Sequence, residues 1–187
     1  VSEMVKAKQV ILMPYAEASS DDTTDLAPRI DSLNGKVIGL LANGWRSLDY
    51  SYDEFKKLLE EKYEVAEVII KRKPGSSPLP LEELEDVAAR ADAVISALGN
   101  WGSCTAWCIH DSVELEKRGV PTVALSTKFF EPLAMATAKG KGMPQLKQVI
   151  FPFPLETLPE EEVREIALNL FDEVTSQLLV QPPESDT

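Results

Sequence analysis

The segment Asp92–Leu125, DAVISALGNWGSCTAWCIHDSVELEKRGVPTVAL, decides the fold. An apolar run of strand length, Ala93–Leu98, ends at the turn Gly99–Gly102. A stretch of helical length comes next, and we expect Ser103 to be its N-cap. A second apolar run of strand length, Val120–Leu125, follows the helix. Two strands joined by a helix form a right-handed βαβ unit, and the turn after the first strand lies at the carboxyl edge of the sheet, where ligands usually bind.

The rest of the chain continues this alternation of strands and helices. Further strands are expected at Gln9–Met13, Lys36–Leu41, Val65–Ile70 and Gln148–Phe151, and helices at Ala27–Leu33 (a short turn), Tyr52–Tyr63, Leu81–Ala91, Phe129–Lys139 and Pro159–Leu179. The pattern predicts an α/β fold: a three-layer, open, mostly parallel sheet with helices on both faces, flavodoxin-like or Rossmann-like.

Residues 35–180 are expected to form a single α/β domain. Residues 1–34 precede it as an amino-terminal strand and a flexible acidic loop (16–25), and residues 181–187 read as a disordered tail. With the common strand order 2-1-3-4-5, the loops Asn43–Ser47 and Gly99–Cys104 would face each other across the crevice where the strand order reverses.

Composition narrows the possible partners. The chain of 187 residues carries a net charge of −12 and has a pI near 4.6, so nucleic acid and anionic membranes would repel it. No apolar run reaches the roughly 18 residues of a membrane-spanning helix, and the amino end shows no signal-peptide pattern. Together with only two cysteines, which suggest reduced thiols, this leads us to expect a cytoplasmic protein.

Cys104 is the leading candidate for chemistry. A thiol in the first turn of a helix lies near free backbone N–H groups and the positive end of the helix dipole, which favour its thiolate. Gly102 would let a ligand approach the same N–H groups, which could hold a carboxylate or an oxyanion. The residues alone leave equally open that Cys104 is a small buried apolar residue.

Cys108 lies one helical turn after Cys104, and a core role is favoured over that of a second redox thiol. The two Cβ vectors are nearly parallel, which disfavours a disulfide. His110 falls about 240° around the helix from Cys104, so it and Asp111 read as capping, surface or subunit-contact residues. The basic triplet Lys71–Lys73 reads as a solvated surface. Two cysteines and one histidine are too few soft ligands for a metal site.

Further site residues are inferred from their position in the expected crevice. They are Asn43, Arg46, Trp101, Gly102, Ser103, Thr105, Ser126 and Thr127. Arg46 could pair with a substrate carboxylate. The turn Ala42–Gly44 lacks a dinucleotide or P-loop fingerprint, so we expect no cofactor. The helix after Gly102 carries two apolar stripes, which suggests burial against the sheet and against another subunit in a homodimer or hetero-oligomer.

The stretch GNWGSCTAWCIHDSVELEKRGVPTVAL, Gly99–Leu125, resembles the signature of the UGSC-motif family, in which selenocysteine or cysteine is followed by Gly-Ser-Cys. The similarity extends over about 35–170, with LNGKVIGLLANG before the motif and IFPFP after it. The sequence is more distantly similar to the selenoprotein B component of glycine and betaine reductases.

The resemblance implies thiol or selenol chemistry, in which the first motif residue attacks an activated carbon and the cysteine at the position of Cys104 resolves the adduct. Trp101 stands at the first motif position here, and Phe153 stands where the reductases have histidine. An indole is not a nucleophile of this kind, so Cys104 would act without that partner and Trp101 would wall the pocket.

Three functions follow from these observations. The first is a small-molecule enzyme that uses Cys104 on a carboxylate-bearing substrate in a lyase, hydratase or isomerase type of reaction. The second is a thiol-dependent reductase that uses Cys104 and Cys108. The third is a non-catalytic subunit of a hetero-oligomer.

Overall fold

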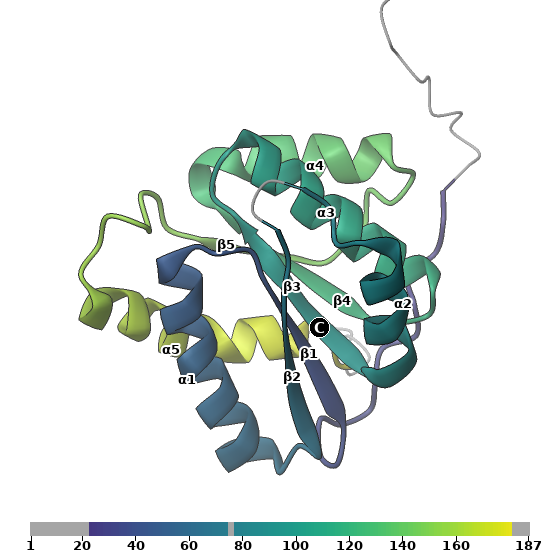
Figure 1. Cartoon of the computed structure of the whole chain (residues 1–187), viewed down its shortest axis with the longest axis horizontal. Coiled ribbons are helices and arrows are strands. Elements are labelled where there is room, and N and C mark those ends of the chain that lie inside the picture. Colours follow the sequence, from purple (N-terminus) through teal and green to yellow (C-terminus); the bar gives the residue numbers. More distant parts are fainter. Residues whose placement is uncertain (1–22, 75–76, 181–187) are drawn as a thin grey trace, which may run out of the picture.

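The computed structural model describes residues 23–74 and 77–180, which form one parallel sheet with helices on both faces (Figure 1). The elements are β1 (Val37–Ala42), α1 (Arg46–Tyr63), β2 (Glu67–Arg72), α2 (Leu81–Arg90), β3 (Ala93–Gly99), α3 (Gly102–Lys117), β4 (Thr122–Thr127), the 3₁₀ turn η1 (Lys128–Phe130), α4 (Glu131–Gly140), β5 (Gln148–Phe151) and α5 (Glu160–Ser176). The strand order is β2-β1-β3-β4-β5, with all neighbours parallel, which confirms the predicted α/β fold and its strand order.

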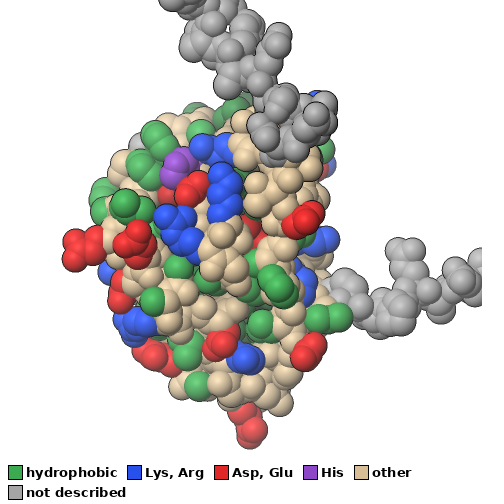
Figure 2. Space-filling model, turned by 90° about the vertical axis from the view of Figure 1, so that its right-hand side faces the viewer, with side chains coloured by type: hydrophobic (Ala, Val, Ile, Leu, Met, Phe, Trp, Pro, Cys, Tyr) green, Lys and Arg blue, Asp and Glu red, His purple; other side chains and the backbone are tan. Residues whose placement is uncertain are grey.

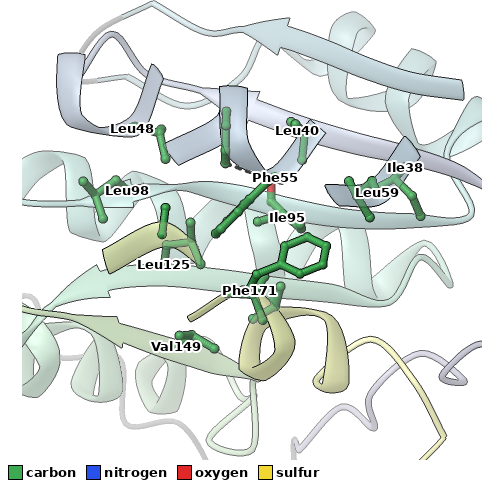
Figure 3. Close-up of a cluster of buried hydrophobic side chains, with 14 of the residues drawn as sticks. Ile38, Leu40, Leu48, Phe55, Leu59, Ile95, Leu98, Leu125, Val149 and Phe171 are labelled. Atoms are coloured by element: carbon green, nitrogen blue, oxygen red, sulfur yellow. Dashed lines mark hydrogen bonds between the residues drawn. The ribbon is translucent and has the colours of Figure 1, made fainter. Parts of the chain in front are cut away.

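Two apolar layers hold the helices on the sheet. The helices α1 and α5 cover one face, where Phe55 and Phe171 pack against Leu40, Ile95 and further sheet residues (Figure 3). The helices α2, α3 and α4 cover the other face. Most residues of the two apolar stripes of α3 are buried against the sheet, α2 and α4, whereas Ala106 and Trp107 are only partly buried. Burial on both faces explains why β3 is a nearly continuous apolar run and why the centre of β4, Val123–Leu125, is apolar as well.

A local irregularity in β3 is stabilised from both faces of the sheet. The pairing of β3 with β4 shifts register between Ile95 and Leu98. From the α1 side, the Tyr52 hydroxyl donates to Ser96 O at 2.7 Å. From the α3 side, Cys108 Sγ donates to Ala97 O at 2.7 Å. These two buried donors satisfy carbonyl groups where the regular ladder is interrupted.

Three local predictions were wrong, and in each case the structure supplies the reason. The first concerns the short helix at Ala27–Leu33. This segment is irregular rather than helical, because Ala27 N–H donates to the buried Glu116 carboxylate at 2.7 Å and Ile30 forms a parallel bridge with Leu179. Tertiary partners thus take up backbone groups that a helix would have paired with one another.

The second and third errors concern where helices begin. Helix α1 begins at Arg46 rather than Tyr52, because the Glu156 carboxylate accepts the N–H groups of Arg46 and Ser47 at 3.2 and 3.0 Å. Helix α3 begins at Gly102 because Trp101 O accepts the Thr105 N–H at 3.0 Å and the Cys104 Sγ accepts the Trp101 N–H at 3.0 Å, which makes Trp101 the N-cap. Ser103 is therefore an exposed first-turn residue and not the cap.

The end of the last helix also differs from the expectation. Helix α5 ends at Ser176, three residues before the predicted end at Leu179. The expected strand Gln9–Met13, residues 16–22 of the acidic loop and the tail 181–187 lie outside the described residues.

Candidate functional site

The carboxyl ends of β1, β3 and β4 meet where the strand order reverses. Asn43, which follows β1, donates its Nδ2 to Leu98 O in β3 at 2.9 Å. Gly99, the last residue of β3, pairs with Ser126 of β4. The residues predicted from the ends of these three strands therefore do lie side by side. Arg46 and Ser47 belong to the first turn of α1 rather than to a loop.

Several side-chain oxygens are buried at these strand ends without a partner. Within residues 23–74 and 77–180, no hydrogen bond reaches Asn43 Oδ1, Ser47 Oγ, Asn100 Oδ1 or Ser126 Oγ, and these residues are at most 6% exposed. In native proteins the large majority of buried polar groups have a hydrogen-bond partner, so four unpartnered oxygens in one region are unusual for a protein core. A polar ligand that completes these hydrogen bonds would account for it.

Cys104 lies in the first turn of α3, directly beside this region. Its side chain is 4% exposed, and its Sγ accepts the Trp101 N–H at 3.0 Å and lies 3.1 Å from Trp101 O. The first N–H groups of the helix have no acceptor within the helix itself. The arrangement therefore combines a sulfur held in place by backbone contacts with donors that suit an anion.

The glycines around Cys104 differ in what surrounds them. A Cβ on Gly99 would lie 2.7 Å from Thr105 Oγ1 and 3.1 Å from Ser126 Oγ, so the end of β3 packs too closely for a side chain. A Cβ on Gly102 would meet no described atom within 4 Å. The backbone at Gly102 therefore borders open space that a ligand can enter.

The remaining predicted contacts are placed differently from one another. Ser126 and Thr127 extend β4 by two residues past the expected end of the strand at Leu125, and both are buried. Thr105 is buried and its hydroxyl donates to Trp101 O at 2.7 Å. Arg46 is exposed, donates to Glu156 O at 3.2 Å and lies over the Tyr50 ring. The side chains of Thr105 and Arg46 thus have partners within the chain.

Cys108 is inside the α/β core. It has no exposed area, and burial raises the pKa of its thiol from 9.0 to about 11. Cys104 and Cys108 are both free thiols. Because a neutral thiol is a poor nucleophile, these surroundings suit Cys108 as a structural hydrogen-bond donor.

Asp111 and Lys73 form a buried ion pair that was missed in the sequence, where Lys73 was interpreted as solvated and Asp111 as a capping, surface or subunit-contact residue. Their side chains are each 1% exposed, and both Asp111 carboxylate oxygens also accept the Leu79 N–H. Arg72, the neighbour of Lys73 in the basic triplet, is exposed as predicted, whereas Lys73 is buried. His110, next to Asp111 and 30% exposed, is the single purple side chain at the surface in Figure 2, on a face that mixes acidic and basic residues.

An exposed aromatic cluster borders the site. It consists of Trp101 from the β3–α3 turn, Phe129 and Phe130 from η1, and Phe153 after β5. Phe129 and Phe130 were not predicted as site residues. The available signal was their position directly after the strand that ends at Thr127, where ligand contacts were already expected.

A metal site and a membrane-spanning helix are both absent from the described part of the chain. Nowhere in 23–74 or 77–180 do three or more His, Cys, Asp or Glu side chains gather in a way that could hold a metal ion. In the same residues, no helix combines the length and the apolar character that crossing a membrane requires.

Fold and site together define an α/β protein of flavodoxin-like strand order with a candidate small-molecule site at the reversal of that order. The chain belongs to the UGSC family, whose sequence model matches residues 10–180. No curated protein matches it. Among solved structures, it is similar to an FMN-dependent NADH-azoreductase from Bacillus anthracis, solved in complex with FMN. The identity is 11%, the match covers 77% of this chain and 99% of that one, and the TM-score is 0.38.

Proposed function

We propose that this UGSC-family chain is an enzyme that uses Cys104 on a small carboxylate-bearing substrate, in a lyase, hydratase or isomerase type of reaction. The observation that carries the proposal is the set of buried, unpartnered oxygens at the ends of β1, β3 and β4, the edge of the sheet at which α3 begins: Asn43 Oδ1, Asn100 Oδ1 and Ser126 Oγ. Leaving one such atom unsatisfied costs about 1–3 kcal/mol, and a bound polar ligand would remove that cost.

The first turn of α3 provides the groups that this chemistry needs. Its N–H groups at Gly102 and Ser103 would hold the carboxylate. The Cys104 sulfur would remove a proton from the adjacent carbon as a thiolate. In an isomerisation the resulting thiol would return the proton to the product. In an elimination the electron pair of the broken C–H bond would form the double bond, and the thiol would protonate the hydroxyl or amino group that leaves the neighbouring carbon as water or amine; hydration is the reverse. The proton count balances, and no external oxidant or reductant is needed. Trp101, at the N-cap, would wall the pocket and limit the access of water.

The two alternatives stand differently against the structure. A dithiol reductase would need Cys108, but this thiol has no exposed area and its pKa is raised to about 11 by burial. A non-catalytic subunit of a hetero-oligomer has one observation in its favour, the exposed aromatic cluster. Turnover by the purified chain on its own would argue against this last alternative.

The proposed function is tested by following small hydroxy, amino and unsaturated carboxylates with ¹H NMR in D₂O, where proton abstraction or addition to a double bond introduces deuterium. We expect Cys104→Ser and Cys104→Ala to lower the rate by about 10²–10⁴-fold, the usual contribution of a positioned acid or base. Cys108→Ser is the matched control and should keep most of the rate. Full turnover by Cys104→Ala would remove the thiol from the mechanism.

A further inference from the structure

The aromatic cluster is a large apolar surface left open to solvent at the carboxyl edge of the sheet. Trp101, Phe129 and Phe153 are 57%, 68% and 42% exposed. The ring of Phe129 stacks on that of Phe153 with centroids 5.2 Å apart, and Phe130 contacts both of these rings as well as Trp101 at 6.1 Å. Contiguous exposed apolar patches often mark binding sites, whereas single exposed apolar residues scattered over a surface do not.

Trp101 joins this cluster to the polar part of the site. It stands between Asn100, whose Oδ1 is buried without a partner, and Gly102, where α3 begins. Its backbone N–H also holds the Cys104 sulfur at 3.0 Å. A ligand whose polar end reaches the strand ends therefore passes Trp101, and an apolar extension of that ligand meets the aromatic cluster.

The polar part of the site offers a ligand both hydrogen-bond acceptors and hydrogen-bond donors. Asn43 donates its Nδ2 to Leu98 O, which orients its amide and leaves Oδ1 as an acceptor. Asn100 Oδ1 is a second buried acceptor. These two oxygens need a donor on the ligand, whereas the first N–H groups of α3 need an acceptor. A carboxylate with a hydroxyl or amino group on the adjacent carbon offers both on neighbouring atoms.

We propose that the site takes a 2-hydroxy or 2-amino carboxylate with an aryl side chain. The carboxylate binds the N–H groups at Gly102 and Ser103, the hydroxyl or amino group donates to the Asn43 and Asn100 side-chain oxygens, and the aryl ring packs on Trp101 and Phe130. This inference rests on the proposed function for the place of the ligand, and it adds the substrate class.

The test is calorimetric or ligand-observed NMR binding to the full chain with four probes. 3-Phenyllactate and phenylalanine carry all three groups, 3-phenylpropionate lacks the donor, and lactate lacks the ring. We expect the better of the first two to bind at least about tenfold more tightly than 3-phenylpropionate, because that analogue leaves both asparagine oxygens unpaired. Lactate should bind at least about tenfold more weakly as well, since its methyl group buries far less apolar area.

Variants of the cluster separate ring packing from general effects on the fold. Phe130→Leu and Phe153→Leu should weaken 3-phenyllactate about fivefold or more and leave lactate unchanged. Leu81→Ala, at a residue that is 63% exposed on α2, is the matched control and should change neither affinity. Equal affinity for the four probes, or no response to the two Phe variants, would overturn the inference.

Further measurements distinguish a ligand site from a dimer interface. They also separate failure of this inference from failure of the thiol mechanism. If the chain is a dimer that Phe153→Ser dissociates, the cluster is an interface between copies and the inference fails. Binding of 3-phenyllactate that survives in Cys104→Ser supports the inference, even if Cys104→Ala also retains turnover and so defeats the thiol mechanism. Conversion of lactate without any preference for aryl acids would overturn the inference and leave the thiol mechanism standing.

Discussion

Cys104 and Cys108 lie one helical turn apart but in different surroundings. Cys104 Sγ contacts the backbone of Trp101 at the carboxyl edge of the sheet. Cys108 Sγ faces the interior and donates to Ala97 O in β3. Side chains four residues apart on a helix lie one above the other, so a single turn separates the edge of the sheet from its core. The difference in depth is what distinguishes a candidate for chemistry from a structural thiol.

The buried Cys108 thiol makes folding sensitive to alkaline pH. Its pKa is about 11 in the folded chain against an ordinary 9.0, so between these values the unfolded chain has lost a proton that the folded chain keeps. Stability is therefore complete below pH 9 and falls as the pH rises, by about 2–3 kcal/mol at pH 11. Urea unfolding from pH 8 to pH 10 should show a steeper loss for the wild type than for Cys108→Ser. Parallel curves would contradict this.

Among the elements, α3 and the segment after β2 are joined by the buried pair of Lys73 and Asp111. Lys73 N–H also donates to Ala42 O at 2.8 Å, which extends the pairing of β1 with β2 beyond the end of β2. Asp111 accepts the Leu79 N–H, just before α2 begins. One carboxylate on α3 thus holds both Lys73, just after β2, and Leu79, just before α2.

Removing one partner of this pair should be costly. Lys73→Met leaves the Asp111 carboxylate buried without its cation, and we expect a loss of about 3–5 kcal/mol in the free energy of unfolding. Lys71→Met is the matched control, because Lys71 pairs with Glu83 at 3.2 Å where the side chains are 29% and 39% exposed. It should cost about 0–1 kcal/mol. Chemical denaturation measures both, and similar losses for the two variants would refute the special role of Lys73.

At the scale of the whole molecule, segments near the two ends of the described chain pair with each other. Ile30 pairs with Leu179, and Val180 N–H donates to Ile30 O at 3.0 Å. The Arg29 guanidinium binds the Glu116 carboxylate at 2.6 Å, and Glu116 also accepts the N–H groups of Ala27 and Thr122. A buried acid at the end of α3 therefore anchors the segment that leads into β1.

Loss of the Arg29 side chain should loosen this anchor before it affects the sheet. In Arg29→Met, hydrogen–deuterium exchange followed by mass spectrometry should speed up in peptides that contain Ala27–Ile30 and Leu178–Val180, with β3 unchanged. Lys36→Met is the comparison variant, since the pair of Lys36 and Asp92 is over a third exposed on both sides and screened by solvent. Uniform acceleration across the chain would show that Arg29 supports global stability instead.

The apolar pattern was sufficient to predict the five strands of the described sheet, and the strand order common to such folds predicted their arrangement. Buried parallel strands are encoded locally as short apolar runs that end in glycine or polar residues. The start of α1 and the conformation of Ala27–Leu33 were not predictable in this way. Glu156 and Glu116 decide them, and each acts on backbone that lies more than 80 residues away.

For this protein, the sequence by itself determined the α/β alternation, the turn that holds Cys104 and membership of the UGSC family. Only the tertiary structure decided three matters: that the pair of Lys73 and Asp111 is buried, that four side-chain oxygens at the strand ends and in the first turn of α1 are buried without partners among the described residues, and that Trp101 joins three phenylalanines in one aromatic cluster. The physical reason is that strands and helices follow from local periodicity, whereas burial and hydrogen-bond satisfaction depend on which distant segments pack together.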